Sequence, residues 1–142
     1  MSELSRILSL VLLLVFAACS DDNLTASNDT LPLDMDWKLV SAGPPGMNQP
    51  VDGTYTLRFS RDLTIHGNDA CNVCTGTYSP GARSRIAIFP TCTEKACTPS
   101  PSFGYAEALG HVTSFYNDRD RLVLVYQTAS GDTWEMVHVQ NE

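Results

Sequence analysis

Four cysteines lie close together in the middle of the 142-residue sequence, and they could do two kinds of chemistry. Two residues separate Cys71 from Cys74, and four separate Cys92 from Cys97. Thiols at such spacings can pair as disulfides in an oxidising compartment, or hold a zinc ion as thiolates where they stay reduced. The compartment therefore decides between the two, and the fifth cysteine, Cys19, bears on that question.

The N-terminal segment predicts export. Ile7–Ala18 is apolar except for Ser9, which is shorter than the roughly 20 residues of a membrane-spanning helix but typical of a signal-peptide core. Small residues directly before Cys19 make the segment resemble the lipobox of bacterial lipoproteins. This implies cleavage after residue 18 and acylation of Cys19, for example with palmitate, where each buried methylene contributes about 0.8 kcal/mol to anchoring. An ordinary secretory signal with a chance cysteine is the alternative.

Charge divides the rest of the chain. From Cys19 to Asp36 there are five acidic residues and no basic one, whereas residues 37–142 hold ten acidic and eight basic residues. We expect a signal peptide over residues 1–18, a flexible acidic tether over 19–35 and a folded domain over 36–142. The net charge of −7 argues against a basic nucleic-acid-binding protein.

The residue after the expected lipidation site predicts the membrane to which the protein is sorted. In the enterobacterial sorting rule, Ser20 in place of an aspartate directs a lipoprotein to the outer membrane. The run Ser20-Asp21-Asp22 also resembles a surface-export tag of some Gram-negative lipoproteins. We therefore expect a lipid-anchored envelope protein on the periplasmic face of the outer membrane or at the cell surface.

In that compartment the four clustered cysteines are expected to form disulfides. Antiparallel strands oppose residues that are symmetric about their turn, and both Cys74–Cys92 and Cys71–Cys97 are centred just past the Pro80–Gly81 turn. This nested pairing is favoured among the three connectivities that four cysteines allow. Each bridge is expected to stabilise the domain by about 2–4 kcal/mol.

Other chemistry has weaker support. A four-cysteine zinc site stays an alternative, although Thr75 and Thr98 stand where a zinc knuckle usually has glycine. The three histidines fall in different predicted elements: strand alternation can place His66 and His138 outward, and His111 lies on a predicted helix. Because a hydrolase needs a nucleophile, a base and an orienting acid together, we expect no enzyme and no cofactor.

Period-2 patterning predicts the elements that position these residues. Seven runs rich in β-branched and aromatic residues alternate with turn residues. These runs are residues 37–40, 54–59, 63–66, 74–79, 85–89, 121–126 and 133–139. Between Pro101 and Asn117, apolar residues recur at steps of three and four, which predicts a helix that Ser102 can cap. The predicted class is α+β: an antiparallel β-meander or barrel-like sheet of about seven strands with one covering helix.

A family resemblance spans the predicted domain. Its residues, in order, are Trp37-x-Leu39, Phe59, Gly67-x-x-x-Cys71-Asn72, Gly76-x-Tyr78, Thr93-x-x-Ala96-Cys97, Glu107, Leu109 and Leu122-x-Leu124. This pattern resembles the META domain, the family of the heat-shock lipoprotein HslJ. The resemblance implies a small α+β envelope domain with no known catalytic centre, often linked to stress or antibiotic tolerance. Cys74 and Cys92 look like an added pair, and Thr98–Pro101 looks like an insertion.

Two functions follow as expectations. The first is a non-enzymatic envelope lipoprotein whose disulfide-stapled META-like domain binds an unknown protein or a small apolar ligand. The second is a periplasmic inhibitor of a lysozyme or protease. An inhibitor needs a rigid protruding loop, and the candidate is Ala42–Gly53, which contains Pro44, Pro45 and Pro50.

Overall fold

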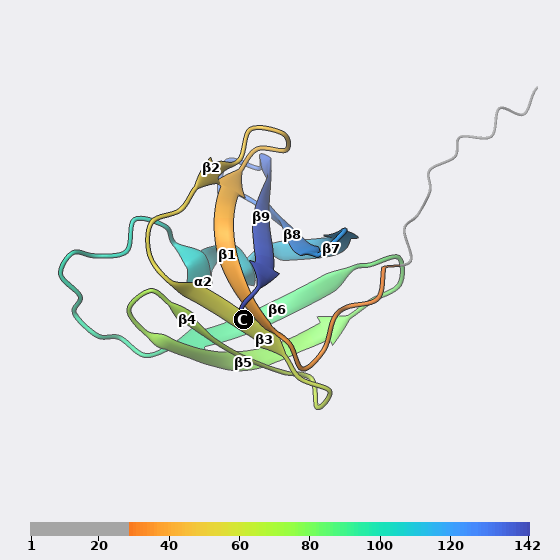
Figure 1. The fold of residues 1–142 in the computed structure, drawn as a ribbon, viewed down its shortest axis with the longest axis horizontal. Helices are drawn as coiled ribbons and strands as arrows, with labels where there is room; N and C mark the ends of the chain where they lie inside the picture. The colour runs from red at the N-terminus through yellow and green to blue at the C-terminus, as the bar shows by residue number, and fades with distance from the viewer. Residues whose placement is uncertain (1–28) are drawn as a thin grey trace, which may run out of the picture.

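The structure, a computed structural model, describes residues 29–142 (Figure 1). The expected signal peptide and the expected lipidation site at Cys19 lie outside these residues. The elements are β1 (Asp36–Gly43), β2 (Gln49–Pro50), β3 (Tyr55–Phe59), β4 (Thr64–Asp69), β5 (Val73–Pro80), β6 (Ile86–Cys92), α2 (Tyr105–Gly110), β7 (Val112–Asp118), β8 (Arg121–Gln127) and β9 (Thr133–Gln140). No helix among the described residues is long and apolar enough to span a membrane.

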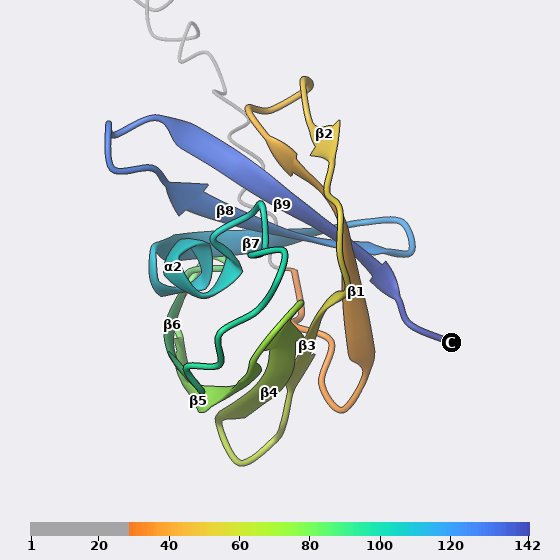
Figure 2. The ribbon, with the colours of Figure 1, turned by 90° about the vertical axis from the view of Figure 1, so that its left-hand side faces the viewer.

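One antiparallel sheet curls into a half-barrel. Its strands follow the order β6-β5-β4-β3-β1-β9-β8-β7, and β2 pairs with β1 beside this path. The two outermost strands approach each other where Arg85 forms a bridge with Ser114 and the Phe115 amide donates to the Ser84 carbonyl at 2.9 Å. Figure 2 shows α2 between the two arms of the curled sheet, where it packs against β6 and β8.

Alternation on the strands builds the core. Tyr55, Leu57 and Phe59 of β3 all point inward and are almost completely buried. The Phe59 ring packs edge-on against Tyr78, with ring centroids 5.1 Å apart. Burying a side chain of this size contributes about 1.5–3 kcal/mol, so the inward rows of the sheet hold the barrel together.

The antiparallel order gives the barrel two ends. The turn end holds the β3–β4, β5–β6 and β7–β8 turns, the start of β1 and the end of β9. The loop end holds the β1–β3 connection, the β4–β5 and β8–β9 turns, and the long β6–β7 connection with α2. The clustered cysteines are therefore at or near the loop end.

The expected helix over residues 101–117 is wrong in its extent. The helix α2 covers only Tyr105–Gly110, its N-cap is Gly104 without a side-chain cap, and Val112–Asp118 forms strand β7. A register shift between Val112 and Ser114 is the physical reason. A β-bulge adds one residue to a strand, so Val112 and Phe115 both face inward and their spacing of three imitates a helix. The half-barrel also has one more strand on its main path than expected, while the α+β class agrees.

The folded region begins earlier than expected. Residues 29–35, assigned to the tether, lie against the sheet, and Leu31, Leu33 and Met35 pack on the core. The Asp34 amide donates to the Phe59 carbonyl at 2.7 Å. These contacts make the end of the expected tether part of the domain.

Candidate functional site

Two disulfides shape the loop end of the barrel. Cys74 and Cys92 sit directly opposite each other on β5 and β6, with Cα atoms 4.0 Å apart. Cys71, in the β4–β5 turn, is joined to Cys97 in the β6–α2 connection, with Cα atoms 6.1 Å apart. The structure thus has the nested pairing favoured from the sequence. The second bridge ties residues 93–104, which we call the 93–104 loop, to the sheet.

Side chains of the β4–β5 turn reinforce this attachment. The Asp69 carboxylate accepts hydrogen bonds from the Cys71 and Asn72 amides at 3.1 and 2.5 Å, which fixes the turn. The Asn72 side-chain oxygen accepts from the Lys95 amide at 2.7 Å and from the Thr93 hydroxyl at 3.1 Å. The turn and the first part of the loop therefore form one rigid unit.

A groove runs between the 93–104 loop and the body of the domain. It consists of two adjoining hollows of about 390 and 520 Å³ that share Cys97, Ser100 and Pro101. The first hollow lies between the β4–β5 turn, the loop and α2, with Glu107 on its wall. The second lies between the loop and the segment that enters β3, where Gly53 forms part of the wall. The loop is thus a wall common to both hollows.

A buried hydroxyl lies beneath the second hollow. Tyr55 is 0% exposed, and its hydroxyl has no hydrogen-bond partner among the described residues. A Cβ at Gly53 would lie 3.1 Å from Cε2 of the Tyr55 ring and 3.5 Å from its Cζ, so Gly53, which lines the second hollow, lies against the hydroxyl-bearing end of this ring. The Tyr55 ring packs edge-on against Phe103 and Tyr105, at centroid distances of 6.0 and 5.4 Å.

A buried tyrosine–histidine pair anchors α2. The Tyr105 hydroxyl lies 2.9 Å from His138 Nε2, and His138 Nδ1 lies 3.3 Å from the Leu122 carbonyl. A neutral ring with its proton on Nδ1 satisfies both contacts, accepting from Tyr105 and donating to Leu122. Burial lowers the pKa of His138 to about 4 and raises the pKa of Tyr105.

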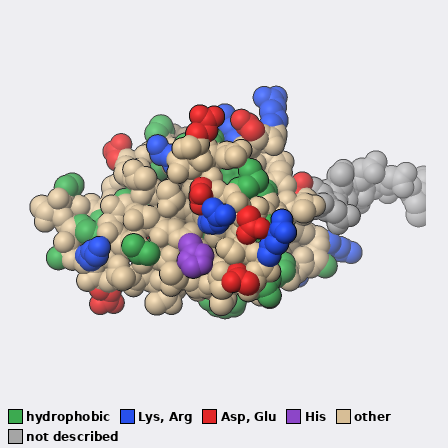
Figure 3. All heavy atoms as spheres, turned by 60° about the horizontal axis from the view of Figure 1, so that its bottom comes forward, with side chains coloured by type: hydrophobic (Ala, Val, Ile, Leu, Met, Phe, Trp, Pro, Cys, Tyr) green, Lys and Arg blue, Asp and Glu red, His purple; other side chains and the backbone are tan. Residues whose placement is uncertain are grey.

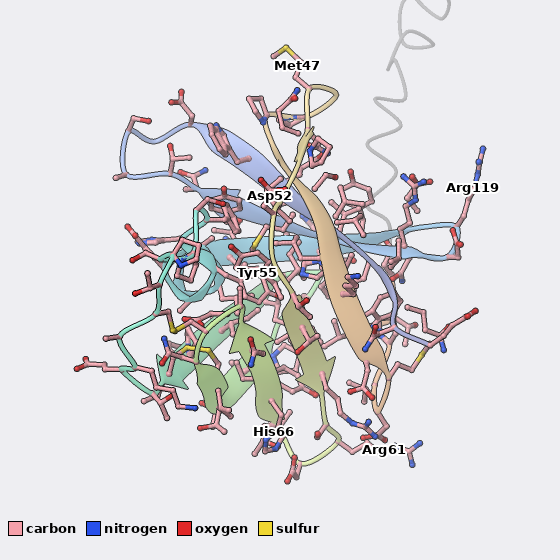
Figure 4. The ribbon with its side chains drawn as sticks, turned by 60° about the vertical axis from the view of Figure 1, so that its left-hand side comes forward. Met47, Asp52, Tyr55, Arg61, His66 and Arg119 are labelled. Atoms are coloured by element: carbon pink, nitrogen blue, oxygen red, sulfur yellow. A yellow bond between two sulfur atoms is a disulfide. The ribbon has the colours of Figure 1, made fainter. Side chains whose placement is uncertain are left out.

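The expectation that His138 points outward is wrong. The residue is 0% exposed because it lies on a central strand, paired with Leu39 on one side and Leu122 on the other. His66 is exposed on β4 (Figure 4), and His111 is exposed at the end of α2. The three histidines therefore do not share a site. Strand alternation could not have predicted the contact between His138 and Tyr105, because the two residues lie on different elements.

The cysteine geometry also bears on the zinc alternative. Asp69, Cys74 and Cys92 each offer one ligand atom within 4.8 Å of the others. In this structure the two sulfurs of that group are bonded to each other, and zinc needs free thiolates. Among the described residues, the group that could hold a metal ion thus consists of one carboxylate and two cysteines, and not of four cysteines. It could bind zinc only after the Cys74–Cys92 disulfide was reduced.

The proline-rich loop forms a projecting hairpin. Strand β2 pairs with Ser41 and Ala42 of β1, and the Met47 amide donates to the Pro44 carbonyl at 2.9 Å in the turn. The Met47 side chain is 65% exposed and lies at the tip, pointing away from the body (Figure 4). An apolar side chain is thus presented on a backbone restricted by pairing and by proline.

Comparisons with known proteins agree with this architecture. A crystal structure of a DUF4847 family protein from Bacteroides vulgatus has a TM-score of 0.56 at 14% identity, covering 72% of this chain and 90% of that one. An NMR structure of a protein from Burkholderia xenovorans has a TM-score of 0.54 at 19% identity, covering 77% and 83%. Both likenesses concern the fold alone, and no curated protein matches the sequence. The META domain family matches residues 29–141, which is most of the chain, and this protein therefore belongs to that family.

Proposed function

We propose that this chain is a non-enzymatic lipoprotein of the bacterial cell envelope whose META domain binds a small apolar ligand or a protein segment in the groove. The observation that carries the proposal is a preformed groove whose loop wall is fixed by a disulfide and by the bonds of Asn72. A wall held in place before binding loses little conformational entropy when the ligand arrives.

The anchoring part of the proposal depends on the leader. Cys19 follows a short apolar segment and small residues, so cleavage and acylation there would hold the domain at a membrane. Ser20 supports the outer membrane as the destination. Membership of the META family supports a role in heat shock or another envelope stress.

Size and lining support a small ligand with an apolar body. The two hollows fall within the roughly 300–1,000 Å³ of small-molecule sites. Pro99 and Pro101 supply apolar wall in the second hollow, and Lys95 and Glu107 supply charge in the first. Gly53 of the second hollow lies against the Tyr55 ring, whose buried hydroxyl has no hydrogen-bond partner among the described residues.

Two titratable groups in or next to the groove support a binding role. The groove-lining carboxylate of Asp69 is occupied by two backbone amides of its own turn. His138, the histidine bonded to a groove-lining tyrosine, is sealed in the core and cannot exchange protons with a ligand. These positions favour a binding role over general acid–base chemistry.

Fluorescence of an aromatic dye that emits more strongly in apolar surroundings tests the binding site. Titration with 1-anilinonaphthalene-8-sulfonate should raise the dye's emission with the wild-type protein. Ser100→Trp, which fills the part shared by the two hollows, should weaken dye binding about tenfold, the effect of losing about 1.4 kcal/mol. Gln140→Trp, exposed on the end of β9, is the matched control and should bind like wild type. Equal dye binding by all three proteins would contradict a ligand site in the groove.

The projecting hairpin favours a second candidate function, inhibition of a periplasmic lysozyme or protease. Inhibitors of this kind present a rigid loop, and the exposed Met47 on the β1–β2 hairpin is such a feature. The purified protein should then slow peptidoglycan cleavage by a lysozyme or peptide cleavage by a protease, and Met47→Asp should abolish the effect. Absence of inhibition by the wild-type protein would remove this candidate and leave the groove proposal intact.

A further inference from the structure

Charge is distributed unequally between the two ends of the barrel. The half nearer the loop end holds six acidic side chains and a single basic one, a net charge of −5; they are Asp52, Asp69, Glu94, Glu107, Asp132 and Glu135, with Lys95. The described half nearer the turn end holds seven of each sign, a net charge of zero. Its basic side chains are Lys38, Arg58, Arg61, Arg83, Arg85, Arg119 and Arg121, and its acidic ones are Asp29, Asp34, Asp36, Asp62, Asp118, Asp120 and Glu142.

The face turned forward in Figure 3 does not carry charge of one sign. Lys and Arg side chains lie interspersed with Asp and Glu side chains on it, among backbone and uncharged side chains. Charges interact over about 8 Å at physiological salt. A flat anionic surface would therefore repel the negatively charged loop end when it came close, and it would repel the turn end, with its net charge of zero, less.

The described chain begins at the turn end. The Asp29 amide donates to the Ser84 hydroxyl at 3.0 Å, and the Asn117 side-chain amide donates to the Thr30 carbonyl at 2.9 Å. Residues 29 and 30 thus lie between the β5–β6 turn and the end of β7. Ten residue steps separate Asp29 from Cys19, and ten extended residues span at most about 36 Å. An anchor at Cys19 therefore keeps the turn end within about 36 Å of the bilayer, and the chain leaves the domain from that end.

Four exposed arginines lie in or next to the two turns beside this starting point. Arg83, Arg85, Arg119 and Arg121 are all exposed, and none forms an ion pair with a described residue. Figure 4 shows Arg119 at the tip of the β7–β8 turn, pointing away from the barrel. A guanidinium group offers a planar fork of donors that matches phosphate oxygens.

We propose that the turn end rests on a surface of anionic phospholipid headgroups, with these four arginines contacting their phosphates, while the groove and the Met47 hairpin face away from the membrane. The inference rests on the proposed anchor at Cys19. The negative potential of an anionic leaflet attracts basic side chains close to it and repels the loop end with its net charge of −5. The membrane thereby orients the binding groove toward its ligands.

Carboxylate labelling on vesicles tests this orientation. The mature chain from Cys19, with its other four cysteines in disulfides, is coupled through the Cys19 thiol to a maleimide lipid. One set of vesicles is phosphatidylcholine alone, and the other also contains phosphatidylglycerol. Carbodiimide labelling followed by mass spectrometry reports the reactivity of Asp118 and Asp120 at the turn end and of Glu94 and Asp132 at the loop end. On anionic vesicles the first two should label about threefold more slowly than on neutral ones, and the last two should be unchanged.

Charge variants separate orientation from folding. Replacing Arg83, Arg85, Arg119 and Arg121 by glutamine brings the turn end from zero to −4, close to the −5 of the loop end, so the protection should disappear. Lys95→Gln, which brings the loop end to −6, is the matched control and should keep it. Thermal unfolding like wild type shows that the fourfold variant is folded.

Two results would overturn the proposal: equal labelling of Asp118 and Asp120 on both kinds of vesicle, or protection of Glu94 and Asp132 on the anionic ones. The chemical coupling makes either result independent of acylation in the cell. Acylation itself is tested by incorporation of labelled palmitate, which Cys19→Ala should abolish.

Discussion

Acid should destabilise this domain through a single buried histidine. His138 is 0% exposed and neutral, and burial lowers its pKa from 6.5 to about 4. Below pH 6.5 the unfolded chain binds a proton at this histidine, whereas the folded protein binds it only near pH 4. The contribution of His138 to the free energy of unfolding is therefore fully present above pH 6.5 and is lost as the pH falls toward 4. At about 1.4 kcal/mol per pKa unit, the loss reaches about 2 kcal/mol at pH 5 and about 3 kcal/mol below pH 4.

The variant His138→Gln isolates this contribution. A glutamine oxygen can still accept the Tyr105 hydroxyl, but the side chain does not titrate. The variant is expected to be less stable than wild type at neutral pH, because it loses the ring's packing and its contact with Leu122. The difference between the two proteins should then shrink by about 2 kcal/mol between pH 7.5 and pH 5.

Urea unfolding at a series of pH values, followed by the fluorescence of Trp37 and Trp134, measures this difference. Carboxylates also weaken the fold in acid; for example, hydrogen bonds from Thr64 lower the pKa of Asp62. Such groups are present in both proteins, so the difference between wild type and variant cancels them. A difference that stays constant from pH 7.5 to pH 5 would refute the assignment of His138 as a neutral, buried partner of Tyr105.

Three further predictions concern the Cys71–Cys97 bridge, the close pairing of β5 with β6, and the 93–104 loop. Replacing Cys71 and Cys97 by serine should lower the free energy of unfolding in urea by about 3 kcal/mol, since the bridge closes a loop of 26 residues; an unchanged midpoint would contradict the pairing. Gly76→Ala should lower the same free energy by about 2 kcal/mol or more, because its Cβ would collide with a backbone carbonyl of β6, whereas a neutral effect would contradict this close approach. Asn72→Ala should speed amide hydrogen exchange in the 93–104 loop about tenfold, since a bond to the loop backbone is lost, and unchanged exchange would show that the bond does not hold the loop.

Much of the barrel could be predicted because its signals are local. The runs over residues 54–59 and 121–126 alternate in the printed sequence, and the structure makes them β3 and β8. The pairing of Cys74 with Cys92 followed from their symmetric placement about one turn, since an antiparallel hairpin sets its own register.

The features that could not be predicted depend on contacts distant in sequence. A bulge on β7 gave Val112 and Phe115 a helix-like spacing, and only the pairing with β8 shows it to be a strand. His138 is buried because β1 and β8 flank its strand on both sides. The alternation of residues along β9 gives no information about these neighbouring strands. The packing of Leu31 and Leu33 on the core likewise depends on the finished barrel.

The groove was beyond sequence analysis for the same reason. Its walls come from the β4–β5 turn, the 93–104 loop and the segment that enters β3, which only the fold brings together. The Asn72 side chain joins two of these walls. In the sequence, only its place in the family pattern set Asn72 apart from other polar residues. Nothing in the sequence distinguishes Tyr55, with its unpartnered hydroxyl, from other core tyrosines.

We have proposed that an acylated Cys19 holds a doubly disulfide-bonded META domain at a membrane. Intact-mass spectrometry of the protein extracted from its native membranes without reductant tests it most directly. We expect a chain that begins at Cys19, carries a diacylglycerol and a further acyl group, and lacks the four thiol hydrogens of Cys71, Cys74, Cys92 and Cys97. A chain that retains residues 1–18, carries no lipid and has free thiols would contradict it.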